Sequence, residues 1–150
     1  MKTNIISYQT TTNEIAALRD IEEHKMLDPI KEGKWSIREI IGHLYYWDKF
    51  ILEQHIPFME QGANLIEFPD HDSHNNEGIQ YISSIQNVAE LIDQFAHTRN
   101  QLFEALERIQ NDVRFTIGSG KRKFTIESYI GIFSEHDIHH LEQIRNKLAL

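Results

Sequence analysis

The chain has 150 residues, 40% of them hydrophobic and 25% charged, and carries a formal net charge of −8. A chain of this size suits one domain with one core, so we expect residues 1–150 to form a single soluble domain. The negative charge disfavours nucleic acid, which proteins bind through Lys and Arg, and no window holds the roughly 18 apolar residues that a membrane-spanning helix needs.

The opening residues and the lack of cysteine bear on the compartment and on the available chemistry. Residues 1–7 contain one positive charge with no apolar run behind it, so we expect no secretory signal and a cytoplasmic protein. The absence of cysteine removes disulfides, thiolate metal ligands and cysteine nucleophiles. Any metal ion must therefore be bound through nitrogen and oxygen.

Four helix starts are marked by side chains that can accept hydrogen bonds from free backbone N–H groups. The S/T-x-x-E/Q capping box occurs at Thr11–Glu14, Ser36–Glu39 and Ser83–Gln86. Thr125 is a simpler N-cap. These signals predict helices over residues 11–27, 36–56, 84–110 and 125–148. The fold class is thus all-α, a four-helix bundle, whose second helix should end or kink at Pro57.

The connections between these helices differ in length. Residues 61–82 are polar and lack a helical period, so we expect a long crossover loop between the second and third helices. A long link lets those two helices run parallel, whereas the short joint around Gly33 makes the first two antiparallel. Before the last helix, apolar residues alternate through Val113–Ile126 around a glycine-rich turn. This pattern indicates a small β-hairpin, although an irregular loop fits it equally well.

Three histidines occupy inward positions on two of the predicted helices. His136 and His140 are four residues apart, so on a helix their rings lie on one face, and both fall on the apolar stripe of the last helix. His43 takes an inward position between Ile40 and Trp47 on the second helix. We therefore expect three imidazoles to face one bundle interior.

Two interpretations of these imidazoles remain open on the residue pattern. Buried imidazoles that lie close together resist protonation and need partners, and a divalent ion would accept all three lone pairs. Alternatively, each is a core histidine that is hydrogen bonded to a backbone or side-chain group.

Two segments resemble motifs of the DinB/YfiT-like superfamily. GKWSIREIIGHL at residues 33–44 resembles its G-K-W-S-x-x-E-x-x-x-H-L segment, and HDIHHLEQI at residues 136–144 resembles its H-x-x-H-H-x-x-Q-I segment. The resemblance covers nearly the whole chain. It implies an up-down-down-up four-helix bundle, frequently a homodimer, with a divalent metal ion bound by His43, His136 and His140. Zinc, nickel, iron and manganese are not distinguished.

The resemblance also implies a metal-dependent enzyme that acts on a small molecule. The family includes transferases that use bacillithiol, mycothiol or glutathione, and a maleylpyruvate isomerase branch. The ion would activate either a low-molecular-weight thiol, for S-transfer, or water, for hydrolysis. A non-catalytic metal- or ligand-binding dimeric bundle is the alternative. No residue is designated as a catalytic acid or base.

Two polar residues and a group of aromatic ones are candidates for a substrate pocket. Arg99 interrupts the apolar stripe of the third helix, so it either pairs with a buried carboxylate, which we favour, or faces a cavity for an anionic substrate. Gln143 follows His140 by three residues and would either orient it or make an interhelical hydrogen bond. The aromatic residues line a pocket, the core or a dimer contact, and they are Tyr45, Tyr46, Trp47 and Phe50.

Other polar residues near these segments have simpler explanations. His139 lies off the inward stripe, so we expect it at the surface beside the ligands. The capping box accounts for Glu39. His71 and His74 stand among aspartates in the crossover, where we expect a solvated loop instead of a second ion site.

Overall fold

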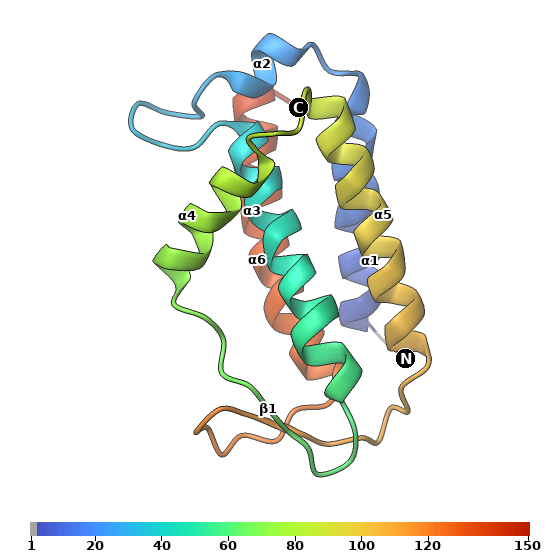
Figure 1. Cartoon of the computed structure of the whole chain (residues 1–150). Helices are drawn as coiled ribbons and strands as arrows, with labels where there is room; N and C mark the ends of the chain where they lie inside the picture. The colour runs from blue at the N-terminus through green and yellow to red at the C-terminus, as the bar shows by residue number, and fades with distance from the viewer. Residues whose placement is uncertain (1–2) are drawn as a thin grey trace.

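The structure, a computed structural model, describes residues 3–150. Met1 and Lys2, which belong to the segment tested for a secretory signal, lie outside the described residues. Four long helices form the bundle, and they are α1 (Thr3–Ala16), α3 (Ile37–Phe50), α5 (Val88–Glu107) and α6 (Ile126–Leu148). In Figure 1, α1 and α6 run in one direction and α3 and α5 in the other. This confirms the all-α, up-down-down-up bundle. Across residues 3–150, no helix has the length and hydropathy to cross a membrane.

The prediction of a first helix over residues 11–27 is wrong. α1 begins at Thr3 and ends at Ala16, and a 3₁₀ turn, η1 (Ala17–Asp20), and a short helix, α2 (Glu23–Leu27), follow it. The hydroxyls of Thr11 and Thr12 donate to carbonyls of the preceding turn instead of capping a helix start. Threonine makes this bond inside helices, so a capping-box pattern can also occur in the middle of one.

The caps of the other three long helices were predicted with mixed success. The box at the start of α3 is confirmed, because Ser36 Oγ accepts from Glu39 N at 3.1 Å and the Glu39 carboxylate accepts from Ser36 N at 3.0 Å. Thr125 caps α6, also as expected. The box at Ser83 is wrong, since Asn87 caps α5 by accepting a bond from the next turn.

The second predicted helix ends close to the expected break. α3 continues through a π-helical turn, η2 (Ile51–His55), and a 3₁₀ turn, η3 (Ile56–Phe58). Pro57 lies in this last turn, and regular helical structure stops there. The break is explained by the missing N–H of proline.

The crossover is not the structureless loop that its composition predicts. It contains α4 (His71–Ile82), whose N-cap Asp70 accepts from Ser73 N at 3.0 Å. α4 packs against α3 (Figure 1) through residues spaced four apart, His74, Gly78 and Ile82. Ile82 alone is strongly apolar among them, so hydropathy shows no helical period. A Cβ on Gly78 would lie 3.0 Å from Tyr46 Cβ, so glycine permits this close approach.

The predicted hairpin over Val113–Ile126 is reduced to one antiparallel bridge between Phe115 and Phe124. The regular strand pair is instead parallel and joins two connections of the bundle. β1 (Asn64–Leu65), in the crossover, pairs with β2 (Thr116–Ile117), which precedes α6. Thr116 and Gly118 donate to Ala63 and Leu65, so the crossover pairs with the edge of this strand opposite Phe124.

The bundle interior consists of two apolar clusters with a polar layer between them. One cluster includes Ile15 of α1 and Ile144 of α6, and the other includes Tyr8 and Tyr129 of the same two helices.

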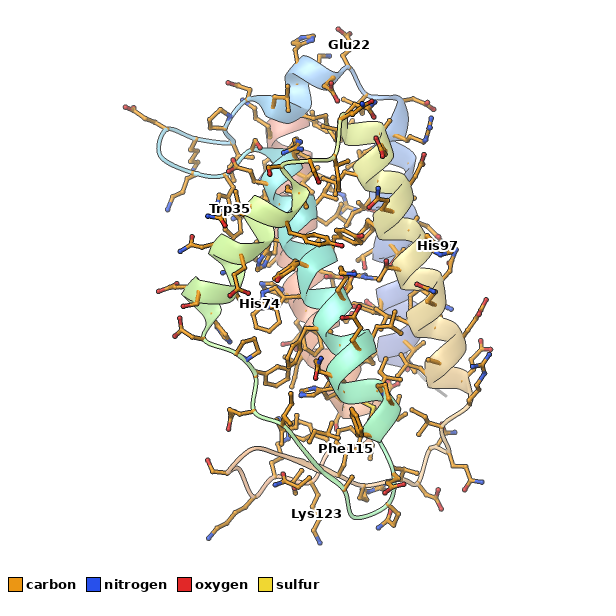
Figure 2. The ribbon with its side chains drawn as sticks, in the orientation of Figure 1. Glu22, Trp35, His74, His97, Phe115 and Lys123 are labelled. Carbon is orange, nitrogen blue, oxygen red and sulfur yellow. The ribbon has the colours of Figure 1, made fainter. Side chains whose placement is uncertain are left out.

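Some histidine side chains point to solvent and others point into the bundle. Figure 2 shows His97 pointing outward from α5, whereas His74 lies on the side of α4 that faces α3.

Arg99 forms the centre of the polar layer and is 1% exposed. Its guanidinium donates from Nε to Asp48 Oδ2 at 2.7 Å and from Nη1 to Asp137 Oδ2 at 2.7 Å. Nη1 also donates to Thr12 Oγ1 at 2.9 Å. Each long helix thus contributes at least one residue to the layer. Burial raises the pKa of Asp48 to about 6, and the Arg99 guanidinium opposes that increase.

Replacing the buried arginine should destabilise the fold. Arg99→Met leaves two buried carboxylates without their cationic partner, so we expect a loss of about 3–5 kcal/mol in the free energy of unfolding at pH 7. The control is Arg19→Met, because Arg19 pairs with Asp93 at the surface, where solvent screens the pair, and its loss should cost far less. Urea denaturation measures both, and equal losses in the two variants would contradict this account of the layer.

Candidate metal centre

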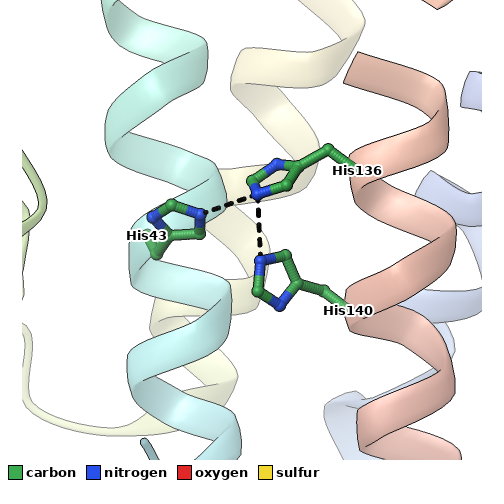
Figure 3. A group of neighbouring side chains, drawn as sticks. All are labelled: His43, His136 and His140. Atoms are coloured by element: carbon green, nitrogen blue, oxygen red, sulfur yellow. Dashed lines mark hydrogen bonds between the residues drawn. The ribbon is translucent and has the colours of Figure 1, made fainter. Parts of the chain in front are cut away.

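The three predicted histidines meet between α3 and α6. His43 projects from α3, while His136 and His140 project from successive turns of α6 (Figure 3). Nε2 of His136 lies 3.4 Å from Nε2 of His43 and 3.1 Å from Nε2 of His140. One nitrogen from each ring falls within a common span of 4.8 Å. Three donor atoms therefore converge on one point.

Amide oxygens hold the outer nitrogens of two of these rings. His43 Nδ1 lies 2.8 Å from Asn75 Oδ1, and His140 Nδ1 lies 2.8 Å from Gln143 Oε1. An amide oxygen only accepts, so each Nδ1 carries the proton and each Nε2 presents its lone pair to the centre. Such outer hydrogen bonds orient metal-binding histidines in proteins. Of the two positions predicted for Gln143, the structure shows the one beside His140.

Burial makes the cluster hard to protonate. Burial and the neighbouring His140 and His136 lower the pKa of His43 to about 3. Burial, with a further contribution from His140, lowers the pKa of His136 to about 4. The pKa of His140 is also lowered by burial. All three rings are consequently neutral at pH 7 and available as ligands.

The donor set fits a divalent cation. Lone pairs of neutral imidazoles that face one another repel, and a cation placed between them removes the repulsion. Imidazole nitrogen suits zinc, nickel and iron better than it suits manganese, which prefers oxygen. His43 and His140 are buried. His136 is exposed as a residue, although surrounding atoms enclose its ring enough to lower its pKa, so the centre is open to solvent on its side.

Aromatic rings from α3 and from the residues just before it support the centre. The ring centroid of Trp35 lies 4.9 Å from that of His43. Trp47 is only 9% exposed, and its ring centroid lies 4.2 Å from that of His74. Its Nε1 donates to Asn75 Oδ1 at 2.9 Å. Trp47 therefore has little surface to offer a substrate and instead contacts the residue that holds His43.

The other polar residues considered from the sequence lie outside the candidate centre. Arg99 is enclosed by its carboxylate partners and does not face the centre. His139 is exposed, and its ring centroid lies 5.5 Å from that of His140. The expectation for the crossover histidines was only half right. His71 is exposed, but His74 is buried and its Nε2 has no hydrogen-bond partner.

Sequence reasoning missed three residues that shape the centre. Asn75 was not identified, because the hydropathy of the crossover shows no helical period and α4 was not expected. Asp48 and Asp137 are the partners of Arg99. An arginine in an apolar stripe signals that such carboxylates exist, and their positions beside Trp47 and His136 on inward-facing segments could have identified them.

Comparisons with known proteins place the chain in a family. The structure of YfiT from Bacillus subtilis, described as "a probable metal-dependent hydrolase with an unusual four-helix bundle topology", aligns with a TM-score of 0.65. The alignment covers 97% of this chain and 83% of YfiT at 15% sequence identity, which shows a common fold. None of the curated proteins matches the chain by sequence. The family model of the DinB superfamily matches residues 8–144, and the chain therefore belongs to this superfamily.

Proposed function

We propose that the chain is a metal-dependent enzyme that holds one divalent ion at Nε2 of His43, His136 and His140 and acts on a small molecule. The convergence of these three nitrogens within 4.8 Å is the observation that carries the proposal. The description of YfiT as a probable metal-dependent hydrolase supports it. Homodimerisation and a cytoplasmic location are further parts of the proposal.

The surroundings of the three ligands suggest how the centre would work. Asn75 and Gln143 fix the rings of His43 and His140, so these two ligands need little reorganisation. Because His136 is the exposed ligand, we infer that a substrate approaches from its side. A divalent ion with three protein ligands keeps open positions and supplies Lewis acidity, which activates water or a thiol as a nucleophile.

Hydrolysis is the reaction that we favour. The description of YfiT supports it, whereas S-transfer from a low-molecular-weight thiol rests on the family resemblance alone. A non-catalytic metal-binding bundle would share the three ligands but turn over no substrate.

Removing any one of the three histidines should remove most of the bound metal. In His43→Ala, His136→Ala or His140→Ala, the ion loses a third of its protein ligands. His139→Ala is the matched control, because His139 lies beside His140 but outside the converging group. Elemental analysis of the purified proteins measures the effect. Equal metal content in wild type and His136→Ala, or a loss confined to His139→Ala, would contradict the assignment.

Activity assays can distinguish hydrolysis from thiol transfer. We expect the protein loaded with zinc, nickel, iron or manganese to hydrolyse members of a panel of activated esters, amides and phosphoesters, and His136→Ala to lose that activity. The same preparations are assayed for thiol transfer to an electrophile with glutathione and bacillithiol. Activity only with a thiol would replace hydrolysis by S-transfer. A metal-loaded protein that is inactive in both assays would favour the non-catalytic bundle.

The pH dependence of metal binding follows from the lowered pKa values of the ligands. A ligand histidine with an ordinary pKa of 6.5 begins to lose its metal to protons just below that pH. His43 and His136, with pKa values of about 3 and about 4, remain neutral to lower pH. Zinc affinity measured by calorimetry should therefore fall at a lower pH than it would for three histidines of ordinary pKa, with the main loss near pH 4, where His43 and His136 become protonated. A steep loss between about pH 6.5 and 5.5 would contradict this prediction.

A further inference from the structure

Asn75 connects the crossover helix to the candidate centre through a single atom. Its Oδ1 lies 2.8 Å from His43 Nδ1 and 2.9 Å from Trp47 Nε1. The three side chains come from two elements, since Asn75 belongs to α4 and both of its partners belong to α3. The contact between His43 and Asn75 spans 32 residues of sequence.

The indole of Trp47 determines which end of the amide faces His43. An indole N–H can only donate a hydrogen bond, so the amide atom beside it must be the oxygen. A flipped amide would place an NH₂ group against this N–H, donor against donor. Since the same oxygen also faces His43 Nδ1, that nitrogen must carry the proton.

The protonated Nδ1 leaves His43 Nε2 as the nitrogen with the lone pair. Nε2 points toward His136 Nε2, at 3.4 Å. If the amide were flipped, its NH₂ group would donate to Nδ1, the proton would move to Nε2, and His43 could not act as a ligand. The choice between these tautomers is therefore made by Asn75, and Trp47 prevents the amide from reversing it.

We propose that Asn75 is a positioning residue that holds His43 in its ligating tautomer, with Trp47 as the lock on the amide. The claim about the tautomer stands on the hydrogen bonds alone. Its consequence for metal affinity rests on the proposed function. Four variants of the full-length chain separate the roles. Asn75→Leu removes the acceptor, Asn75→Asp keeps an oxygen, Trp47→Phe removes the lock, and Asn76→Leu is the control, because Asn76 is exposed one position further along α4.

The tautomer is measured first, without metal. In ¹⁵N-histidine-labelled protein at pH 7, long-range ¹H–¹⁵N correlations distinguish a protonated Nδ1 from a protonated Nε2, and His43→Gln identifies the signals of His43. We expect a protonated Nδ1 in wild type, Asn75→Asp and Asn76→Leu. Asn75→Leu should shift His43 toward a protonated Nε2, and Trp47→Phe should give a mixture. A protonated Nδ1 in both Asn75→Leu and Trp47→Phe would overturn the proposal.

Zinc affinity is measured second, by competition with a chromogenic chelator. We expect Asn75→Leu to bind zinc about 10- to 100-fold more weakly than wild type, as found when outer partners of ligand histidines are removed. Asn75→Asp should restore the affinity, and Asn76→Leu should leave it unchanged. Wild-type affinity in Asn75→Leu would overturn the metal-linked part of the proposal. If wild type binds no zinc while the tautomers follow the pattern above, the proposed function fails and the amide lock stands.

Discussion

The buried guanidinium of Arg99 is the constraint on which the arrangement of the bundle depends. It donates to Asp48 on α3 and to Asp137 on α6, at 2.7 Å in each case. Neither helix can rotate about its axis without leaving a buried charge unpaired, which proteins rarely tolerate. Asp48 follows His43 by little more than one turn, and Asp137 adjoins His136. The ion pairs of the polar layer thus also restrict the directions in which these histidines point.

Features that depend on neighbouring residues could be predicted from the sequence. The helix-start signals located α3, α5 and α6 approximately, and the spacing of apolar residues placed His43, His136 and His140 on inward faces. The box at Ser36 was identified for the same reason, since all of its atoms lie within one turn. The error at Thr11 is also local, because a threonine hydroxyl can bond either forward as a cap or backward to the preceding turn.

Features that depend on contacts between distant segments could not be predicted. α4 is held by its contact with α3 and not by an apolar stripe of its own, so Asn75 gave no sign of its position beside His43. An inward arginine predicts a buried carboxylate partner but does not identify it, and both partners of Arg99 come from other helices. The parallel pairing of β1 with β2 joins residues about fifty positions apart, for which the alternation near Phe124 gave no evidence.

The partnership of α1 with α6 has a consequence for how a newly made chain matures. α1 packs most extensively on α6, which follows the other helices of the bundle in the chain. Because chains leave the ribosome from the N-terminus, α1 must wait until the residues through α6 have been made before its main partner appears. Docking of α6 then brings Asp137 to Arg99 and His136 and His140 to His43 in the same event. A nascent chain that stops before α6 therefore lacks two of the three converging histidines, and the donor set of the candidate centre is completed only when α6 docks.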